Sequence, residues 1–115
     1  MTSVKIHWLA QRLSGLILLP LFIWFIYELS KLSNFSYLQL LTFFHSKMNI
    51  SFFGLMLLII IYHGKLGMQI IFEDYISNKL LRKNIIIIIN ILSYILMIIS
   101  LLSLFYIQLS VNYAS

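Results

Sequence analysis

The chain has 115 residues, of which 62% are hydrophobic and only 10% are charged, and its net charge is +5 at pH 7. Soluble domains are nearer half apolar and a quarter charged, so this composition predicts a membrane protein. The cations are scattered rather than gathered on one face, which excludes a nucleic-acid interface. The chain has no cysteine, which excludes disulfides, thiolate metal sites and iron–sulfur ligation by this chain.

Three apolar stretches are each long enough for the roughly 20 residues that a helical crossing needs. They cover about 13–32, 50–76 and 85–111. Backbone polar groups in lipid must be satisfied within their own segment, so these stretches are expected to be helices. Pro20 lies inside the first of them and is expected to bend it. The sequence therefore predicts an all-α membrane protein, a single transmembrane domain over 1–115 with three transmembrane helices.

The two connections between the stretches differ in character. The first, about 33–49, is polar and aromatic, and its residues 37–44 suit the membrane interface; the second, 77–84, is short and basic. Three crossings put the N-terminus and the second connection on one side, which then carries five cations against two on the other. The positive-inside rule predicts that the N-terminus lies on the matrix or cytoplasmic side.

His63 lies within the second apolar stretch. An imidazole in hydrocarbon is costly and usually marks a functional site, and histidine is a common metal and haem ligand. Gly64 and Gly67 follow it and would let a flat macrocycle or another helix approach the backbone closely. Two interpretations remain open at this point: haem ligation, and a helix-packing notch in which the histidine bonds a neighbour.

Asp74 and Tyr75 close the second stretch. Asp74 follows His63 by eleven residues. This is about three helical turns, which places both side chains on one face about 16 Å apart. The pair forms either an interfacial anchor or a quinone pocket, in which a phenol bonds a carbonyl and an acid–base pair delivers protons. Because the first helix enters at the same membrane face, Arg12, Ser14, Asp74 and Tyr75 are expected to meet at one depth.

Further polar residues lie in or near the apolar stretches. Arg12 either sets orientation by snorkelling or binds an anionic group such as a haem propionate. Lys65 either snorkels or pairs with an acid of a partner chain. His7 and His45 lack matching partners in the sequence and are interpreted as surface residues.

The segment HGKLGMQIIFEDYI, 63–76, resembles the family of small hydrophobic membrane-anchor subunits of succinate dehydrogenase, respiratory complex II. The family's hallmark is a histidine, a glycine four residues on, and an Asp-Tyr pair eleven and twelve residues beyond the histidine. His63, Gly67, Asp74 and Tyr75 match it. The segment WLAQRLSGLILLPLFIW, 8–24, is similar to the family's arginine-containing first helix. Gly15 stands where relatives often have alanine, a departure expected to matter little.

This resemblance implies an anchor that contributes to haem b ligation and to ubiquinone reduction, passing electrons from succinate to ubiquinone in the respiratory chain and tricarboxylic acid cycle. His63 would be an axial ligand of the haem iron, and Arg12 and Ser14 would lie in the polar zone near the propionates. Tyr75 would bond the ubiquinone head group, supported by Asp74. The implied partners are a second membrane-anchor (cytochrome b) subunit, an iron–sulfur subunit, a flavoprotein subunit and the lipid bilayer. The chain is not catalytic alone.

Residue usage rich in Leu, Ile, Lys and Asn but poor in Ala indicates an AT-rich gene. We therefore expect an organelle-encoded, multi-pass protein of the mitochondrial inner membrane, or alternatively of a bacterial inner membrane. Two rival functions stay open. One is the anchor of a quinol–fumarate reductase, which runs the same electron path backwards. The other is a structural membrane subunit without a cofactor, in which His63 would only pack.

Overall fold

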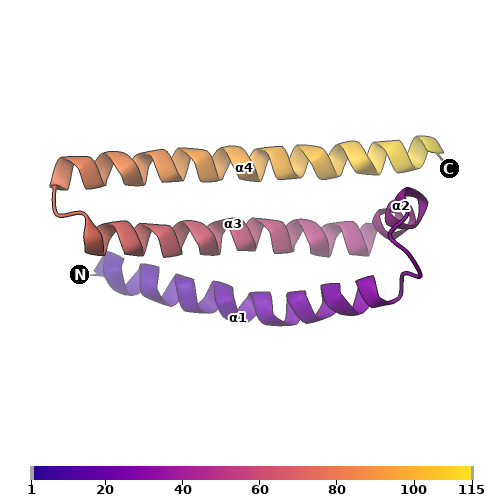
Figure 1. Cartoon of the computed structure of the whole chain (residues 1–115), viewed down its shortest axis with the longest axis horizontal. Helices are drawn as coiled ribbons and strands as arrows, with labels where there is room; N and C mark the ends of the chain where they lie inside the picture. The colour runs from indigo at the N-terminus through magenta and orange to yellow at the C-terminus, as the bar shows by residue number, and fades with distance from the viewer. Residues whose placement is uncertain (1, 115) are drawn as a thin grey trace.

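The computed structural model describes residues 2–114, and the side chains of 5–110. These residues form four helices and no strands: α1 (Thr2–Ser30), α2 (Tyr37–His45), α3 (Lys47–Tyr75) and α4 (Lys79–Ala114). The molecule is elongated, 54 × 25 × 22 Å, with its three long helices lying side by side (Figure 1). Each of the three is long and apolar enough to cross a membrane, which confirms the all-α class and the three predicted crossings.

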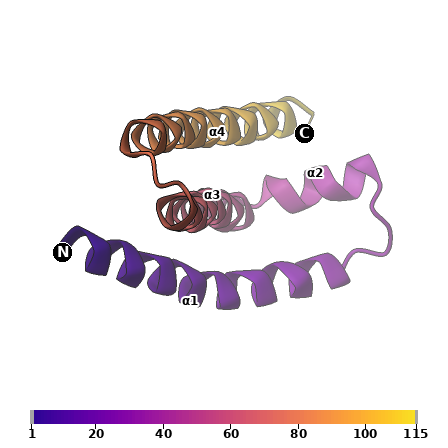
Figure 2. The same ribbon diagram turned by 60° about the vertical axis from the view of Figure 1, so that its left-hand side comes forward.

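The long helices form an open layer rather than a closed bundle. α3 lies in the middle and packs against α1 on one side and α4 on the other (Figures 1 and 2). The chain reverses between successive long helices, so α3 runs antiparallel to both neighbours (Figure 1). Each outer helix therefore has one long helix beside it within the chain, and much of its remaining surface is left to lipid or to other subunits.

The helices extend beyond the apolar stretches that predicted them. α1 begins at Thr2 rather than near 13, and α4 begins at Lys79 rather than near 85, so the second connection shrinks to 76–78. Asn78 explains the second boundary, because its side-chain oxygen accepts a hydrogen bond from Leu81 N at 3.1 Å and caps α4. The hydrophobic stretch measures the part of a helix that lies in hydrocarbon, whereas the helix itself continues into the polar interface.

The first connection is itself largely helical. Ser36 caps α2 by accepting from Gln39 N, and Ser46 caps α3 by accepting from Asn49 N. An aromatic cluster holds α2 against the ends of α1 and α3, with ring centroids 5.1–6.4 Å apart. Its members are Trp24, Phe25, Phe43, Phe44, Phe52 and Phe53. The interface expected over 37–44 is thus a short helix packed by aromatic rings.

α1 curves along its length, as its ribbon shows in Figures 1 and 2. Pro20 lies inside this helix, and it removes one backbone hydrogen bond there. This agrees with the bend expected from the sequence.

The buried core is small because the layer is only one helix thick. Few apolar side chains are buried among those described: Leu18, Phe43, Met56, Leu66, Ile89 and Leu104. Met56 and Leu66, both on α3, are the most deeply buried, each only 2% exposed. The core therefore follows the central helix, and most isoleucine and leucine side chains face outward.

Candidate functional site

The imidazole of His63 is held by a serine of the neighbouring helix. Ser14 Oγ on α1 lies 2.8 Å from His63 Nδ1 on α3, and Ser14 is buried. The same hydroxyl donates to the carbonyl oxygen of Gln11 at 2.9 Å. Since a carbonyl can only accept, the serine proton is used there and the hydroxyl oxygen accepts from Nδ1–H. This assignment places the ring proton on Nδ1 and leaves the lone pair of Nε2 free, which is the arrangement of a metal-ligating histidine.

Gly15 gives the imidazole the room to lie against α1. A Cβ added at Gly15 would stand 3.3 Å from Cε1, 3.9 Å from Nδ1 and 4.0 Å from Nε2 of His63. The ring therefore packs over the backbone at this position, and an alanine here would require it to shift by a few tenths of an ångström. Gly15, where an alanine was expected to make little difference, thus lies in direct contact with His63.

Gly64 and Gly67, the two glycines that follow His63 on α3, differ in their surroundings. A Cβ at Gly67 would meet Gln11 Nε2 of α1 at 3.3 Å, so this glycine serves the packing of α3 on α1. Gly64 has no described atom within 4 Å of such a Cβ, so its backbone is open to lipid or to a partner. Of the two surfaces expected beside His63, only the one at Gly64 is free to be approached.

A groove of about 500 Å³ opens beside His63 between α1 and α3. Its walls are formed by Trp8, Gln11, Arg12, Gly15, Leu16 and His63. The Arg12 guanidinium carbon lies 4.5 Å from the centre of the Trp8 ring, a cation–π contact that orients the arginine. The groove lies within the usual size range of ligand pockets, about 300–1,000 Å³, and combines apolar walls with one imidazole and one cation.

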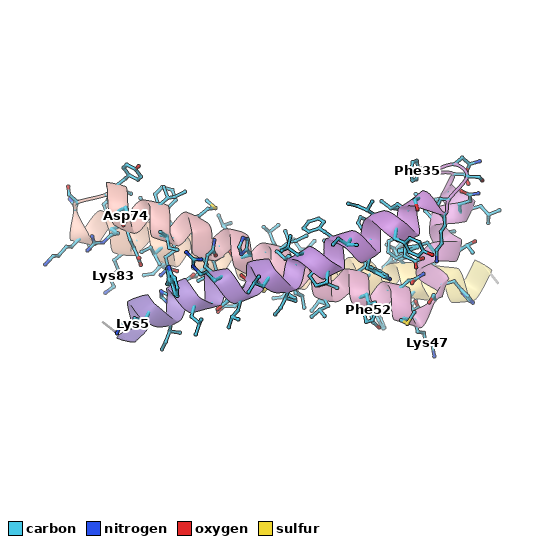
Figure 3. All side chains as sticks on the ribbon, turned by 90° about the horizontal axis from the view of Figure 1, so that it is seen from below. Lys5, Phe35, Lys47, Phe52, Asp74 and Lys83 are labelled. Carbon is cyan, nitrogen blue, oxygen red and sulfur yellow. The ribbon has the colours of Figure 1, made fainter. Side chains whose placement is uncertain are left out.

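The register of α1 against α3 separates two groups that were expected to meet. Ser14 contacts His63, whereas Lys5 lies at the same end of the molecule as Asp74 (Figure 3). Arg12 and Ser14 are therefore level with the imidazole, about 16 Å along the helix from Asp74. The prediction that Arg12, Ser14, Asp74 and Tyr75 share one depth is wrong, because antiparallel packing brings Asp74 beside the first turns of α1 instead.

Asp74 and Tyr75 stand free at the end of α3. Tyr75 is 84% exposed and Asp74 is exposed as well. A groove of about 460 Å³ lies at this end of the layer, lined by Glu73, Lys79, Arg82, Lys83, Ile86 and Ile87. A free phenol and a carboxylate next to a basic groove are accessible to a ligand or to another subunit.

A cluster of part-buried polar side chains lies between His63 and the Asp74 end of α3. Gln69, 9% exposed, donates from Nε2 to Glu73 Oε1 at 3.0 Å, and the same Nε2 lies 3.5 Å from His7 Nδ1. His7 is half-buried, so its interpretation as a partnerless surface residue is wrong. The positions 7, 11 and 14 follow helical spacing along one face of α1, and that periodicity was the signal available in the sequence.

His45 and Lys65 lie apart from this site. His45 is exposed at the end of α2, as expected. Lys65 is on the opposite side of α3, where its ammonium lies 5.2 Å from the centre of the Tyr94 ring of α4. Among the described side chains, no group of three or more His, Cys, Asp or Glu residues could hold a metal ion. The groove beside His63 therefore offers one imidazole among its described wall residues.

Comparison with known proteins finds one matching family and several relatives of this chain. Residues 3–106 match the family described as succinate dehydrogenase/fumarate reductase transmembrane subunit. A succinate dehydrogenase hydrophobic membrane anchor subunit of Rickettsia conorii is 34% identical over 101 residues, covering 87% of this chain and 80% of the relative. Proteins of the same name from Rickettsia typhi and Rickettsia prowazekii are 31% and 32% identical over 100 residues, with the same coverage of both chains.

Proposed function

The chain belongs to the family of succinate dehydrogenase/fumarate reductase transmembrane subunits, and on this premise we propose that it is the hydrophobic membrane anchor of a succinate dehydrogenase. Such an anchor holds the flavoprotein and iron–sulfur subunits at the membrane and passes their electrons to a quinone. The open three-helix layer supports this role, because both of its outer helices leave wide apolar surfaces for a second anchor subunit and for lipid.

The observation that carries the cofactor proposal is the bond between Ser14 and His63. It holds the imidazole in a fixed orientation with Nε2 free, and that nitrogen would be an axial ligand of haem b. The groove beside His63 supports this proposal, and Arg12 on its wall would donate to a propionate. When bound, the haem would accept and release single electrons. The sister anchor, the cytochrome b subunit, would hold the haem together with this chain.

The quinone site would lie at the end of the layer, at Tyr75 and Asp74. Their exposure supports this proposal, since an anchor that reduces ubiquinone must present its phenol to a pocket completed by neighbouring subunits. Tyr75 would donate to the quinone carbonyl, and Asp74 would support proton delivery. Arg12 and Ser14 would serve the haem rather than the quinone, because they are level with His63.

The location that we propose is a bacterial-type inner membrane, crossed by the three long helices. The Rickettsia relatives support this alternative over the mitochondrial inner membrane. The anchor of a quinol–fumarate reductase remains the second candidate function, since the matching family includes fumarate reductase subunits. The reduction potentials of the redox centres in the partner subunits decide the direction of electron flow.

The test is to purify the intact complex through a tag on this chain and to record its spectrum and activity. We expect a flavoprotein, an iron–sulfur subunit and a second anchor to co-purify, with succinate–quinone reductase activity and a b-type band in the reduced-minus-oxidised spectrum. An active complex without haem would overturn the cofactor proposal alone. Absence of both partner subunits and activity would overturn the anchor proposal.

A second experiment addresses the quinone role of Tyr75. Tyr75→Phe removes the phenolic donor, and loss of one hydrogen bond of about 1.4 kcal/mol corresponds to roughly a tenfold fall in quinone reductase turnover. Reduction of a soluble dye by the flavoprotein and iron–sulfur subunits should stay unchanged. Tyr106→Phe, on the exposed surface of α4, is the matched control. Normal quinone turnover in Tyr75→Phe would remove this residue from the site.

A further inference from the structure

Lys65 places a cation in the part of α3 that lies within the membrane. α3 has 29 residues, so it is about 43 Å long, whereas the hydrocarbon core is about 30 Å thick. If α3 spans that core symmetrically, Lys65 lies about 9 Å inside its nearer edge. An ammonium at this depth is costly and requires an explanation.

The side chain does not snorkel toward the nearer end of the helix. Its ammonium lies 5.7 Å from the centre of the Tyr62 ring, which precedes it by one turn, and 5.2 Å from that of Tyr94 on α4. Tyr62 is farther from the Asp74 end than Lys65 is, so the ammonium points toward the middle of the membrane. Side chains on a helix lean toward its N-terminus, which for α3 is this same direction.

The two aromatic rings offset only part of the cost of removing an ammonium from water. A carboxylate would offset the remainder, but none of those described lies within 4 Å of Lys65, since the ion pair found joins Lys31 and Glu28. Tyr62 and Tyr94 are exposed, 37% and 57% respectively, so the site opens to the outside of the layer. Its charge and its phenols are complementary to an anion that approaches from a neighbouring chain.

We propose that Lys65, Tyr62 and Tyr94 form a docking site for a carboxylate on a transmembrane helix of another subunit. A second copy of this chain does not fit as the occupant. Its three acidic residues are Glu28, Glu73 and Asp74, all near helix ends. In a copy with the same orientation, even Glu73 would be about 12 Å from the level of Lys65. The occupant is therefore a different chain with an aspartate or glutamate within the bilayer. This site lies on the face of α3 opposite to His63 and is independent of haem binding.

The proposal rests on the proposed function only in requiring a complex with another membrane subunit. The complex is treated with dicyclohexylcarbodiimide, which enters lipid, activates a carboxyl group and leaves as the urea when an amine attacks to form an amide. Mass spectrometry of peptides should then find Lys65 joined to an aspartate or glutamate of another membrane chain, and Lys65→Arg should lose that link. An intact complex with no link from Lys65, or with links only inside this chain, would overturn the docking site. Failure to isolate any complex would instead count against the proposed function.

Stability of the complex supplies the second measurement. Lys65→Met keeps a long unbranched side chain and removes the charge, and it should speed dissociation of the complex in detergent roughly tenfold or more, because the partner carboxylate is left buried and unpaired. The purified Lys65→Met chain alone should be as stable as the unsubstituted chain. Lys65→Arg keeps the positive charge, so its complex should dissociate as slowly as that of the unsubstituted chain. Lys47→Met, at the exposed start of α3, is the control (Figure 3). Unchanged dissociation, or an equal loss of stability in the chain alone, would contradict the proposal.

Discussion

Replacing His63 by alanine is expected to abolish the b-type band of the purified complex. The imidazole is the only group of the groove walls that can ligate a haem iron, and its Nε2 is the nitrogen left free by the bond to Ser14. Under the proposed function, the haem would then lose the ligand that this chain supplies. The measurement is the reduced-minus-oxidised spectrum of the complex, together with its haem content per chain.

Two variants make this result specific. His45→Ala, on the exposed end of α2, should leave the band unchanged. Ser14→Ala removes the acceptor of Nδ1–H, so it should retain haem but shift its reduction potential, because that bond fixes the orientation of the ring. A full band in His63→Ala would show that this chain does not ligate the haem, and His63 would then be a packing residue held by Ser14.

Met56→Ala is expected to lower the free energy of unfolding of the chain in detergent micelles by about 2 kcal/mol. Met56 is 2% exposed on the central helix, so truncation leaves a cavity where its side chain packed. Loss of a buried methionine in soluble proteins costs about 2–5 kcal/mol. The lower end applies here, because helices in lipid are held by close packing rather than by a hydrophobic driving force.

Met68→Ala provides a control on the same helix with the same change. Met68 is 48% exposed, so its truncation should alter the unfolding free energy by about 0.5 kcal/mol or less. Denaturation of the two variants by an ionic detergent, followed by far-ultraviolet circular dichroism or tryptophan fluorescence, measures the difference. Equal effects at both positions would mean that α3 does not hold the centre of the layer.

The prediction of α3 as one long helix with a histidine in its membrane part depended on local information. Hydrocarbon tolerates only internally satisfied backbone, so an apolar stretch of sufficient length must be helical whatever it packs against. The rotation of about 100° per residue then relates His63 to Asp74 without reference to any other helix. The HGKLG…EDY motif and the match of residues 3–106 to the transmembrane-subunit family then identify the family to which the chain belongs.

The amino-acid sequence by itself determined the all-α class, the three crossings, and the positions of His63, Asp74 and Tyr75 along one helix. Only the tertiary structure decided that Ser14 and Gly15 hold the imidazole, that His7 meets Gln69, and that Lys65 lies between two tyrosine rings. The reason is physical. Positions within a helix follow from its own repeat, but the sliding and rotation of one helix against another depend on the sum of many side-chain contacts between segments that lie far apart in the sequence.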